Sequence, residues 1–386
     1  MLTTSSLFDL PHPVKGNTHF PLLALPGNSP ESSLENSSQN YVACQWNLEL
    51  HPEKRAHWIG LFRSHFVSME KQALDEAADR GESQDVTQSK LAMARQWFMT
   101  YLDQIEENPT CFGSLYIIDI CYAREKALRQ AGIADPYRLA KLKENQSALK
   151  LLPALFDELD NLPDPAKAEQ MIRGTFAGNI YDLGATSTVE LFKDGKPVDF
   201  HAVRQKLSPR PWLIDGLDAW ISKVTSENPY KAAVVFVDNA GCDVIMGMIP
   251  LVRDLLQRGV KVILTANSYP SLNDIIHDEL VPIIHGIAQW DEPLAKALAQ
   301  DRLRVVASGN GAPLIDLACV SEELVDTVNE FEVDLVILEG MGRAIESNLN
   351  AQFTCDSLNI AMVKDAGVAK ALGGKVYDLL CQFQQV

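Results

Sequence analysis

The sequence has no closely spaced cysteine pair, no long apolar run and no excess of positive charge. Its seven cysteines are scattered over 386 residues without a CxxC motif, which is typical of reduced thiols, so we expect a cytoplasmic protein. No run approaches the roughly 18 apolar residues that cross a bilayer, so we expect no membrane-spanning helix. The net charge of −17 argues against nucleic acid or an anionic membrane as a main partner, because both repel an acidic surface.

Several common targeting and catalytic motifs are also missing. The first residues contain Pro11, Pro13, Pro21 and Pro26 and no sustained apolar run, so we expect no signal peptide. The chain has neither the GxxxxGK[ST] sequence of a P-loop kinase nor the GxSxG sequence of a nucleophile elbow. The turn at 309–311 lacks the third glycine of GxGxxG, so it is a weak signal for a nucleotide or S-adenosylmethionine loop.

The composition is that of a folded protein with more than one structural part. Hydrophobic residues make up 46% of the sequence, and the length suffices for two domains. Residues 1–40 include a polar, turn-rich tract and are expected to form an extended arm. Apolar residues recur at helical spacing between Pro52 and Asp160, so we assign 41–184 to an all-helical domain and 185–386 to an α/β domain.

Aromatic residues in the helical part follow the same spacing. Trp58 and Phe62 fall on one expected helical face, and Trp97 and Tyr101 fall on another. We interpret these stripes as core side chains, because an apolar face at helical spacing normally packs against the protein interior rather than against a ligand.

From Lys231 onward, short apolar runs alternate with helical segments. Runs rich in valine and isoleucine that are separated by helices predict a parallel sheet with helices on both faces. The expected strands are Ala233–Val237, Val260–Thr265, Arg304–Ala307, Asp334–Leu338, Asn359–Val363 and a final run, Lys375–Leu379.

The first five expected strands all end in polar or small residues. Ligands bind at the carboxyl ends of the strands in an open α/β sheet. Five such ends together therefore indicate an active site, although any one of them alone reads more simply as a capped loop. The residues concerned are Asp238 and Asn239; Asn267, Ser268, Asn273 and Asp274; 308–312; 339–343; and Lys364 with Asp365.

Three of these side chains have the chemistry of a metal site. Asp238, Asn239 and Asp274 supply oxygen ligands without histidine or cysteine, a set that suits a hard or borderline divalent cation. Such an ion would leave positions for water and substrate oxygens and would stabilise a transferring phosphoryl group. The sequence leaves open whether Asp238 only binds the metal or also acts as a nucleophile or general base.

Other strand ends supply groups that suit a phosphate. Lys364 is a compact cation that can hold the phosphate, and the glycine turns at 309–311 and 340–342 allow backbone N–H groups to approach an anion. Arg343 either contacts the phosphate or pairs with a nearby carboxylate, and the sequence favours neither. The residues that we assign to substrate and phosphate binding are Asn267, Ser268, Gly309, Glu339, Arg343 and Lys364.

In these passages the sequence resembles the damage-control phosphatase family, long described only as domain of unknown function 89. The likeness is to the subfamily that includes plant stand-alone enzymes and the C-terminal domain of pantothenate kinase homologues, and it covers most of the chain except the N-terminal arm. It is carried by Glu339-Gly-Met-Gly-Arg343, Asp135-Pro-Tyr137 with Lys143-Glu-Asn145, Arg173-Gly174 through Gly178-Asn179, Asp238-Asn239 with Asn267-Ser268, and Leu272-Asn-Asp274.

The resemblance implies a helical domain beside a Rossmann-like α/β domain and a metal-dependent phosphatase activity. It places the metal on Asp238, Asn239 and Asp274, with Mn²⁺ as the first choice and Co²⁺, Ni²⁺ or Mg²⁺ as others. It places Lys364 on the phosphate and adds Arg173 to the substrate-binding set.

The substrate that the resemblance implies is a small phosphorylated metabolite, 4′-phosphopantetheine or its oxidised and damaged forms. Hydrolysis would limit the entry of these compounds into coenzyme A. We see no pantothenate kinase domain before the module, so we expect any coupling to kinase activity to occur in trans.

Two other functions remain open from the sequence. One is an S-adenosylmethionine-dependent carboxyl methyltransferase, against which the incomplete glycine loop counts. The other is a catalytically silent metabolite-binding regulator, which the intact set of metal ligands disfavours. The sequence gives no information on the oligomeric state.

Overall fold

The computed structural model describes four stretches of the chain, residues 18–24, 41–44, 47–180 and 200–386. Most of the expected N-terminal arm lies outside the described residues, as does the expected domain boundary between 184 and 185.

The first half of the described chain is helical. The helix α2 begins at Pro52, whose fixed φ suits the first helical position. The N–H that proline lacks would have no partner within the helix at this position. Three of the four aromatic residues expected in the core are buried, with exposed fractions of 7% for Trp58, 5% for Phe62 and 4% for Tyr101, whereas Trp97 is only partly buried. The helices are α2 (Pro52–Asp79), α3 (Gln84–Glu107), α4 (Ile117–Gln130), α5 (Arg138–Asp160) and α6 (Ala166–Asn179).

The second half contains a seven-stranded sheet in the order β1-β7-β6-β5-β2-β3-β4. All neighbouring strands run parallel except β6 and β7. The prediction of a mainly parallel α/β sheet is therefore confirmed. The strands are β1 (Ile214–Asp215), β2 (Ala232–Phe236), β3 (Lys261–Ala266), β4 (Leu303–Ala307), β5 (Leu335–Glu339), β6 (Asp356–Met362) and β7 (Leu379–Gln384).

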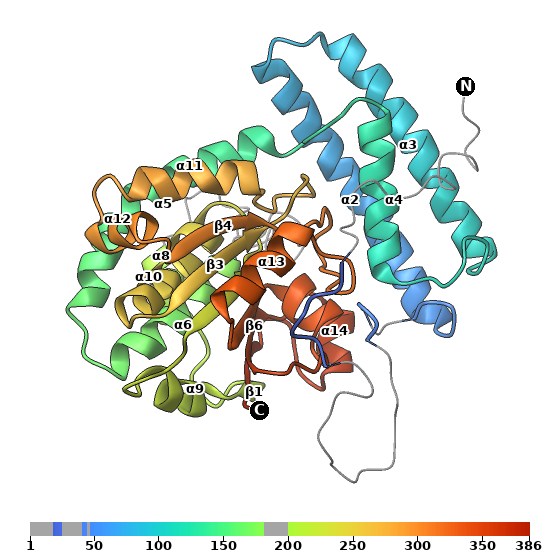
Figure 1. Ribbon diagram of the computed structural model, residues 1–386. Coiled ribbons are helices and arrows are strands. Elements are labelled where there is room, and N and C mark those ends of the chain that lie inside the picture. The colour runs from blue at the N-terminus through green and yellow to red at the C-terminus, as the bar shows by residue number, and fades with distance from the viewer. Residues whose placement is uncertain (1–17, 25–40, 45–46, 181–199) are drawn as a thin grey trace.

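Helices cover both faces of this sheet (Figure 1). Successive side chains of β2 point to opposite faces, so Val234 and Phe236 enter one hydrophobic cluster whereas Ala233 and Val235 enter the other. Both faces of the central strand are thus apolar, as expected of a parallel sheet. The accompanying helices are α8 (Phe200–Lys206), α9 (Leu217–Val224), α10 (Ile249–Gln257), α11 (His277–Ile287), α12 (Glu292–Ala299), α13 (Glu322–Phe331) and α14 (Ala366–Ala371), with two π-helical segments, η1 (Asp243–Met248) and η2 (Met341–Ser347).

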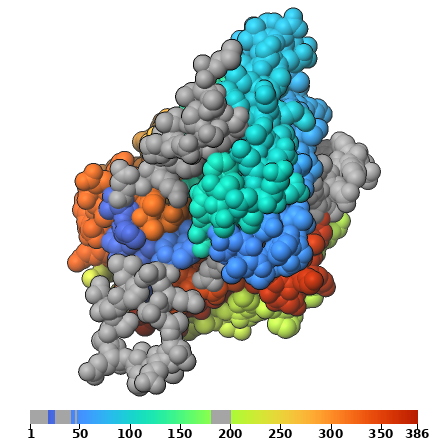
Figure 2. Space-filling model, turned by 90° about the vertical axis from the view of Figure 1, so that its right-hand side faces the viewer, coloured from blue at the N-terminus to red at the C-terminus, as the bar shows by residue number. Residues whose placement is uncertain are grey.

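The helices α2, α3 and α4 share a core with one face of the sheet. Phe66 of α2, Phe98 of α3 and Tyr122 of α4 belong to the same cluster of buried side chains as Val234 and Phe236 of β2. In Figure 2 these helices, coloured blue to teal, form a continuous surface beside the C-terminal residues in red. The helical layer is therefore held to the sheet by a common apolar core.

The prediction of a strand over Lys375–Leu379 is wrong. The strand β7 covers Leu379–Gln384, and the residues before it form a turn in which Tyr377 has a φ of 72°. This left-handed conformation is incompatible with an extended strand. The N–H of Tyr377 instead donates to the carbonyl oxygen of Val363 (2.7 Å) at the end of β6.

None of the helices in the described stretches is both long and apolar enough to span a bilayer. All seven cysteines lie in the described stretches, and none of them forms a disulfide bond.

Candidate active site

The loops that follow β2 and β3 are joined by backbone hydrogen bonds. The N–H of Ile275 donates to the carbonyl oxygen of Asp238 (3.0 Å), and Asn239 forms an isolated antiparallel bridge with Asp274. Because β2 and β3 are parallel neighbours, both loops leave the same edge of the sheet. The bonds between them place Asp238, Asn239 and Asp274 side by side.

These three side chains line one cavity although they are almost fully buried. Their exposed fractions are 5% for Asp238, 2% for Asn239 and 1% for Asp274. The amide nitrogen of Asn239 donates to Asp238 Oδ2 (3.0 Å) and to Asp243 Oδ2 (2.8 Å), so the amide oxygen is the atom that remains to bind a cation. The structure thus brings together all three predicted metal ligands.

Arg343 bridges Asp238 and Asp274 without lining the cavity itself. Its guanidinium donates to the carboxylate of Asp238 and to that of Asp274 (2.7 Å), and also to the side-chain oxygen of Asn267 (3.1 Å). Arg343 is 1% exposed and is not among the residues that line the cavity. Of the two roles left open by the sequence, pairing with carboxylates is the one that the structure shows.

Two glycines allow the segment after β5 to approach the site closely. Gly340 has a φ of 94°, and a Cβ on this residue would overlap the carboxylate of Asp238. A Cβ on Gly342 would overlap the carbonyl oxygen of Pro313. Both glycines are therefore required by contacts within the protein. The segment continues directly into the π-helix η2, a geometry that recurs at functional sites.

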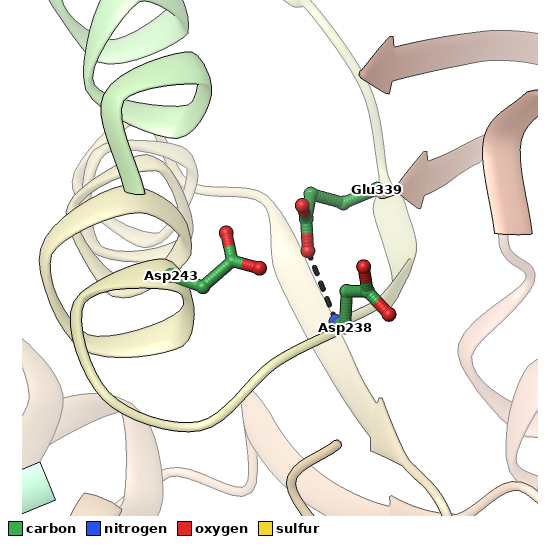
Figure 3. A group of neighbouring side chains, drawn as sticks. All are labelled: Asp238, Asp243 and Glu339. Atoms are coloured by element: carbon green, nitrogen blue, oxygen red, sulfur yellow. Dashed lines mark hydrogen bonds between the residues drawn. The ribbon is translucent and has the colours of Figure 1, made fainter. Parts of the chain in front are cut away.

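A second group of buried polar side chains supports the loop after β2. Glu339 accepts a hydrogen bond from the N–H of Asp238 (3.0 Å), and Asp243 accepts one from the N–H of Asn239 (3.2 Å). Asn179 of α6 donates to Asp243 (3.0 Å) and to Glu339 (2.8 Å). Figure 3 shows Asp243 and Glu339 on the inner side of the loop, while the carboxylate of Asp238 points away from Asp243.

The sequence did not assign Asp243 or Asn179 to the site. The one available signal for Asp243 was that it is the single charged residue at the start of an otherwise apolar helical segment. For Asn179 the signal was the glycine that precedes it, since a glycine within a helix can mark close packing. The structure shows such packing, because a Cβ on Gly178 would lie 2.8 Å from the carbonyl oxygen of Cys242. Close packing of α6 on η1 is what brings Asn179 to the two carboxylates.

The two groups share Asp238 and together fit a cation. Asp238, Asp243 and Glu339 each place one carboxylate oxygen within 4.8 Å of the others. Asp243 Oδ1 and Asn179 Oδ1 are buried and accept no hydrogen bond. Buried acceptors without a donor are costly, and a divalent cation bound by oxygen ligands relieves that cost. The chemistry of the donor set is therefore suited to a metal ion.

Burial raises the pKa of the carboxyl groups of this site. It is the largest cause of the raised pKa of Asp238 and of Glu339, and neighbouring carboxylates raise both further while Arg343 and Lys364 oppose the rise. Burial also raises the pKa of Asp243. Negative charge concentrated away from water is stabilised by a cation more strongly than it would be at the surface.

The cavity measures about 780 Å³, including the part that opens to solvent. Lys364 follows β6 and lines this cavity although it is only 4% exposed. The next residue, Asp365, fixes the loop by accepting hydrogen bonds from the N–H groups of Gly367 (2.7 Å) and Val368 (2.9 Å) at the start of α14. The helical layer forms the opposite wall with Trp58, Leu61, Phe62 and His65 of α2 and with Ile117, Cys121 and Arg124 of α4.

Of the predicted substrate-binding residues, Lys364 lines the cavity and the others do not. The side-chain nitrogen of Asn267 donates to Asp274 Oδ2 (2.9 Å) and so orients a predicted metal ligand. Ser268 accepts a hydrogen bond from the N–H of Gly309 (2.8 Å), which joins two loops and occupies that N–H.

The structure does not bring Arg173 to the cavity. Its guanidinium pairs with Glu169 (2.9 Å) one helical turn earlier in α6 and lies 5.6 Å from the ring centre of Trp212. The residue of this segment that reaches the site is Asn179.

Comparison with known proteins assigns most of the chain to one family. A family model described as the damage-control phosphatase ARMT1-like domain matches residues 61–380. A damage-control phosphatase of Arabidopsis thaliana is 38% identical over 380 residues, with 95% of this chain and 97% of that protein covered.

Two further relatives are longer than this chain. The 4′-phosphopantetheine phosphatase of Mus musculus is 30% identical over 377 residues, and the alignment covers 86% of this chain and 45% of that protein. Pantothenate kinase 2 of Arabidopsis thaliana is 34% identical over 392 residues, which cover 95% of this chain and 41% of that protein. The chain thus spans less than half the length of both.

A solved structure has the same fold. The crystal structure of a DUF89 family protein from Pyrococcus horikoshii superimposes with a TM-score of 0.52 at 17% identity, covering 83% of this chain and 97% of that one. At this identity the likeness shows the fold alone, and it agrees with the mixed α/β architecture.

Proposed function

The chain belongs to the damage-control phosphatase family with an ARMT1-like domain, and on that premise we propose that it hydrolyses phosphate monoesters of small metabolites with the aid of a divalent metal. The observation that carries this proposal is the convergence of two carboxylates, an amide oxygen and a buried lysine on one cavity at the carboxyl edge of the sheet. Anionic oxygen ligands next to a cationic side chain suit a metal that binds a phosphate.

The metal ligands in this proposal are Asp238, Asn239 and Asp274, because these residues line the cavity. Mn²⁺ is the first choice, with Co²⁺, Ni²⁺ or Mg²⁺ as alternatives of similar ligand preference. When bound, the ion would neutralise phosphate charge and polarise the phosphoryl group. Asp243 and Glu339 would hold the ligand loop in place, in the way that hydrogen-bond partners behind metal ligands set ligand orientation.

The protein side chains would supply the rest of the phosphate site. Lys364 would bind a non-bridging phosphate oxygen as a point charge, and its burial strengthens that interaction because water does not screen it. Arg343 would act indirectly, by holding Asp238 and Asp274 at a fixed separation. The layer α2–α4 covers the strand ends and would keep bulk water from the phosphoryl group.

The proposed substrate is 4′-phosphopantetheine or one of its oxidised or damaged forms. One support is the mouse relative that bears the name 4′-phosphopantetheine phosphatase. The other is the largely apolar wall formed by α2, which includes Trp58, Leu61 and Phe62. Such a wall suits a long, weakly polar chain better than a sugar, whose hydroxyl groups need many hydrogen-bond partners.

The direct test is phosphate release from 4′-phosphopantetheine by metal-depleted protein to which Mn²⁺ is restored. We expect release that requires the metal, is lost in Asp274→Ala and is retained in Asp278→Ala. Asp278 is a matched control because it lies four residues away, is largely exposed and does not line the cavity. Full turnover after exhaustive chelation, or equal activity in the two variants, would contradict the proposal.

The methyltransferase alternative is tested in the same preparation. Transfer of a labelled methyl group from S-adenosylmethionine without phosphate release would replace the phosphatase proposal. The family match and the names of the relatives do not favour that outcome.

A further inference from the structure

Arg124 is a buried cation on the wall of the same cavity, opposite the strand ends. It lies on α4, is 1% exposed and lines the cavity. Its guanidinium donates to Glu125 through Nε (2.9 Å) and Nη2 (2.6 Å), and Nη2 also lies 3.4 Å from Ser271 Oγ. Its carbon Cζ lies 5.6 Å from the ring centre of Phe62 on α2.

These contacts fix the guanidinium without using all of its donors. Arginine has five N–H groups in a rigid plane, and within the described residues the hydrogen bonds of the Arg124 guanidinium engage only Nε and Nη2. Burial lowers the pKa of Arg124, but the charge of Glu125 and its hydrogen bonds, together with contributions from Cys121 and Tyr137, raise that pKa on balance, so the group stays charged. A charged, oriented donor beside a cavity is pre-organised to bind an acceptor.

Arg124 and Lys364 act on different parts of the cavity. Lys364 follows β6 and enters the cavity from the edge of the sheet, where Asp238 and Asp274 also line it. Arg124 enters it from α4, whose residues Ile117 and Cys121 line the same wall. The cavity therefore has a phosphate end at the sheet and a second cationic position against the helical layer.

We propose that Arg124 is a specificity-determining residue that donates hydrogen bonds to an oxygen acceptor on the organic part of the substrate while the metal ligands and Lys364 hold the phosphate. This inference rests on the proposed phosphatase function. The ligand class is a phosphate monoester whose chain carries either a neutral carbonyl oxygen, as in an amide, or an anionic oxygen, as in a sulfonate. A monoester with a purely hydrocarbon organic group offers no such acceptor.

The test compares three substrates in wild type, Arg124→Lys and Arg124→Gln. The substrates are phenyl phosphate, 4′-phosphopantetheine, and the sulfonate formed by oxidising the thiol of the latter. We expect kcat/KM for phenyl phosphate to change less than about 3-fold. We expect it to fall about 10-fold for the amide-bearing thiol if Arg124 binds a carbonyl, and about 100-fold for the sulfonate alone if it binds the anionic end.

Arg129→Gln is the matched control. Arg129 lies on the same helix, donates to the carbonyl oxygen of Pro270 (3.4 Å) in the same loop that holds Ser271, and does not line the cavity. If Arg124 only anchored this loop, Arg124→Gln, Arg129→Gln and Ser271→Ala would lower activity toward all three substrates alike. That equal loss would overturn the proposal, as would unchanged selectivity.

Binding provides a readout that does not depend on turnover. Calorimetric titration of metal-depleted protein with 4′-phosphopantetheine and with its sulfonate is expected to show at least about 10-fold weaker binding of one of them in Arg124→Lys. Equal affinity of wild type and Arg124→Lys for both ligands would overturn the proposal. An absence of phosphate release from every substrate, with this difference in binding intact, would reject the phosphatase function but not the role of Arg124 in recognition.

Discussion

The two sides of the loop after β2 differ in what their carboxylates contact. On the cavity side, Asp238, Asn239 and Asp274 present oxygen atoms to a space that a ligand can enter. On the inner side, Asp243 and Glu339 face protein, are fully buried and bind the backbone of the same loop. Carboxylates that are alike in chemistry thus border the cavity on one side and hold the loop on the other. The proposal places the metal on the first group, although the inner carboxylates with Asp238 also form a cluster that could hold a cation.

Charge and burial alone do not separate the two groups. By both measures Glu339, which is 0% exposed, resembles Asp274, which is 1% exposed. What distinguishes them is access, because only Asp274 borders the cavity. Variants on the two sides should therefore differ in both the size and the kind of their effects.

The largest effect is expected for Asp274→Ala, which removes a cavity-side oxygen. Phosphate release should fall by on the order of 10³-fold, because loss of a directly acting electrostatic group in a buried site costs that much. The temperature of thermal unfolding should fall, because the variant leaves the buried guanidinium of Arg343 without one of its two carboxylate partners. Steady-state kinetics together with a melting curve check both parts, and activity within about 10-fold of wild type would count against a ligand role.

Gly340→Ala tests the contact between the two strand ends and should rank second. The new Cβ would overlap the carboxylate of Asp238 and would sit on a backbone with φ 94°. We expect a loss of about 1–3 kcal/mol in the free energy of unfolding from the strained backbone, and a fall in activity from displacement of Asp238. Denaturant unfolding measures the first, and Gly373→Ala is a matched control, because its φ is also positive but no atom lies within 4 Å of the added Cβ.

Arg343→Lys tests the bridge between the cavity-side carboxylates. An ammonium group cannot reproduce two separate N–H contacts in one plane, so we expect metal affinity to fall about 10- to 100-fold, the usual consequence of disturbing a partner of metal ligands. The readout is the Mn²⁺ concentration that restores half of the activity. An unchanged metal requirement with a raised KM would instead assign Arg343 to the phosphate.

The smallest effect is expected for Arg173→Gln. The side chain pairs with Glu169 and stacks on Trp212 away from the cavity, so kcat/KM should stay within about 3-fold of wild type. Because the ion pair joins residues one turn apart on a helix and its Glu169 carboxylate still reaches solvent, the free energy of unfolding should change by less than about 1 kcal/mol. A large loss of activity without loss of stability would return Arg173 to the site.

The sheet and its active edge could be predicted because their signals are local. The central strands β2 and β5 are short runs of five largely apolar residues, with a polar residue at the end of the strand or close behind it. The carboxyl ends of parallel strands lie at the same edge of the sheet, so residues that follow different strands are expected to lie close together. Asp238, Asn239 and Asp274 were found together for this reason.

The inner side of the site could not be predicted because its contacts join distant parts of the chain. Asn179 lies 64 residues from Asp243 and 160 from Glu339, and no periodicity in the sequence encodes how α6 packs on η1. The resemblance pointed to the segment that contains both Arg173 and Asn179. Which of the two reaches the site depends on the rotation of α6 about its axis, and that rotation is set by packing.

The aromatic face of α2 shows a related limit. Its spacing predicted burial, which is correct for Trp58 and Phe62. The same side chains also form a wall of the cavity, because the edge of a core and the wall of a pocket present the same apolar surface. Helical spacing cannot separate these two settings, since both require an apolar stripe.

The most direct test of the central claim is the Mn²⁺ affinity of Asp274→Ala and Glu339→Gln, measured by calorimetric titration of metal-depleted protein. Asp274 lines the cavity and is not part of the inner carboxylate group. Glu339 is part of that inner group and does not line the cavity, and Asp238 belongs to both groups. The account predicts that Asp274→Ala abolishes measurable binding whereas Glu339→Gln weakens it about 10- to 100-fold. Binding that survives in Asp274→Ala and disappears in Glu339→Gln would place the ion on the inner side and contradict the account.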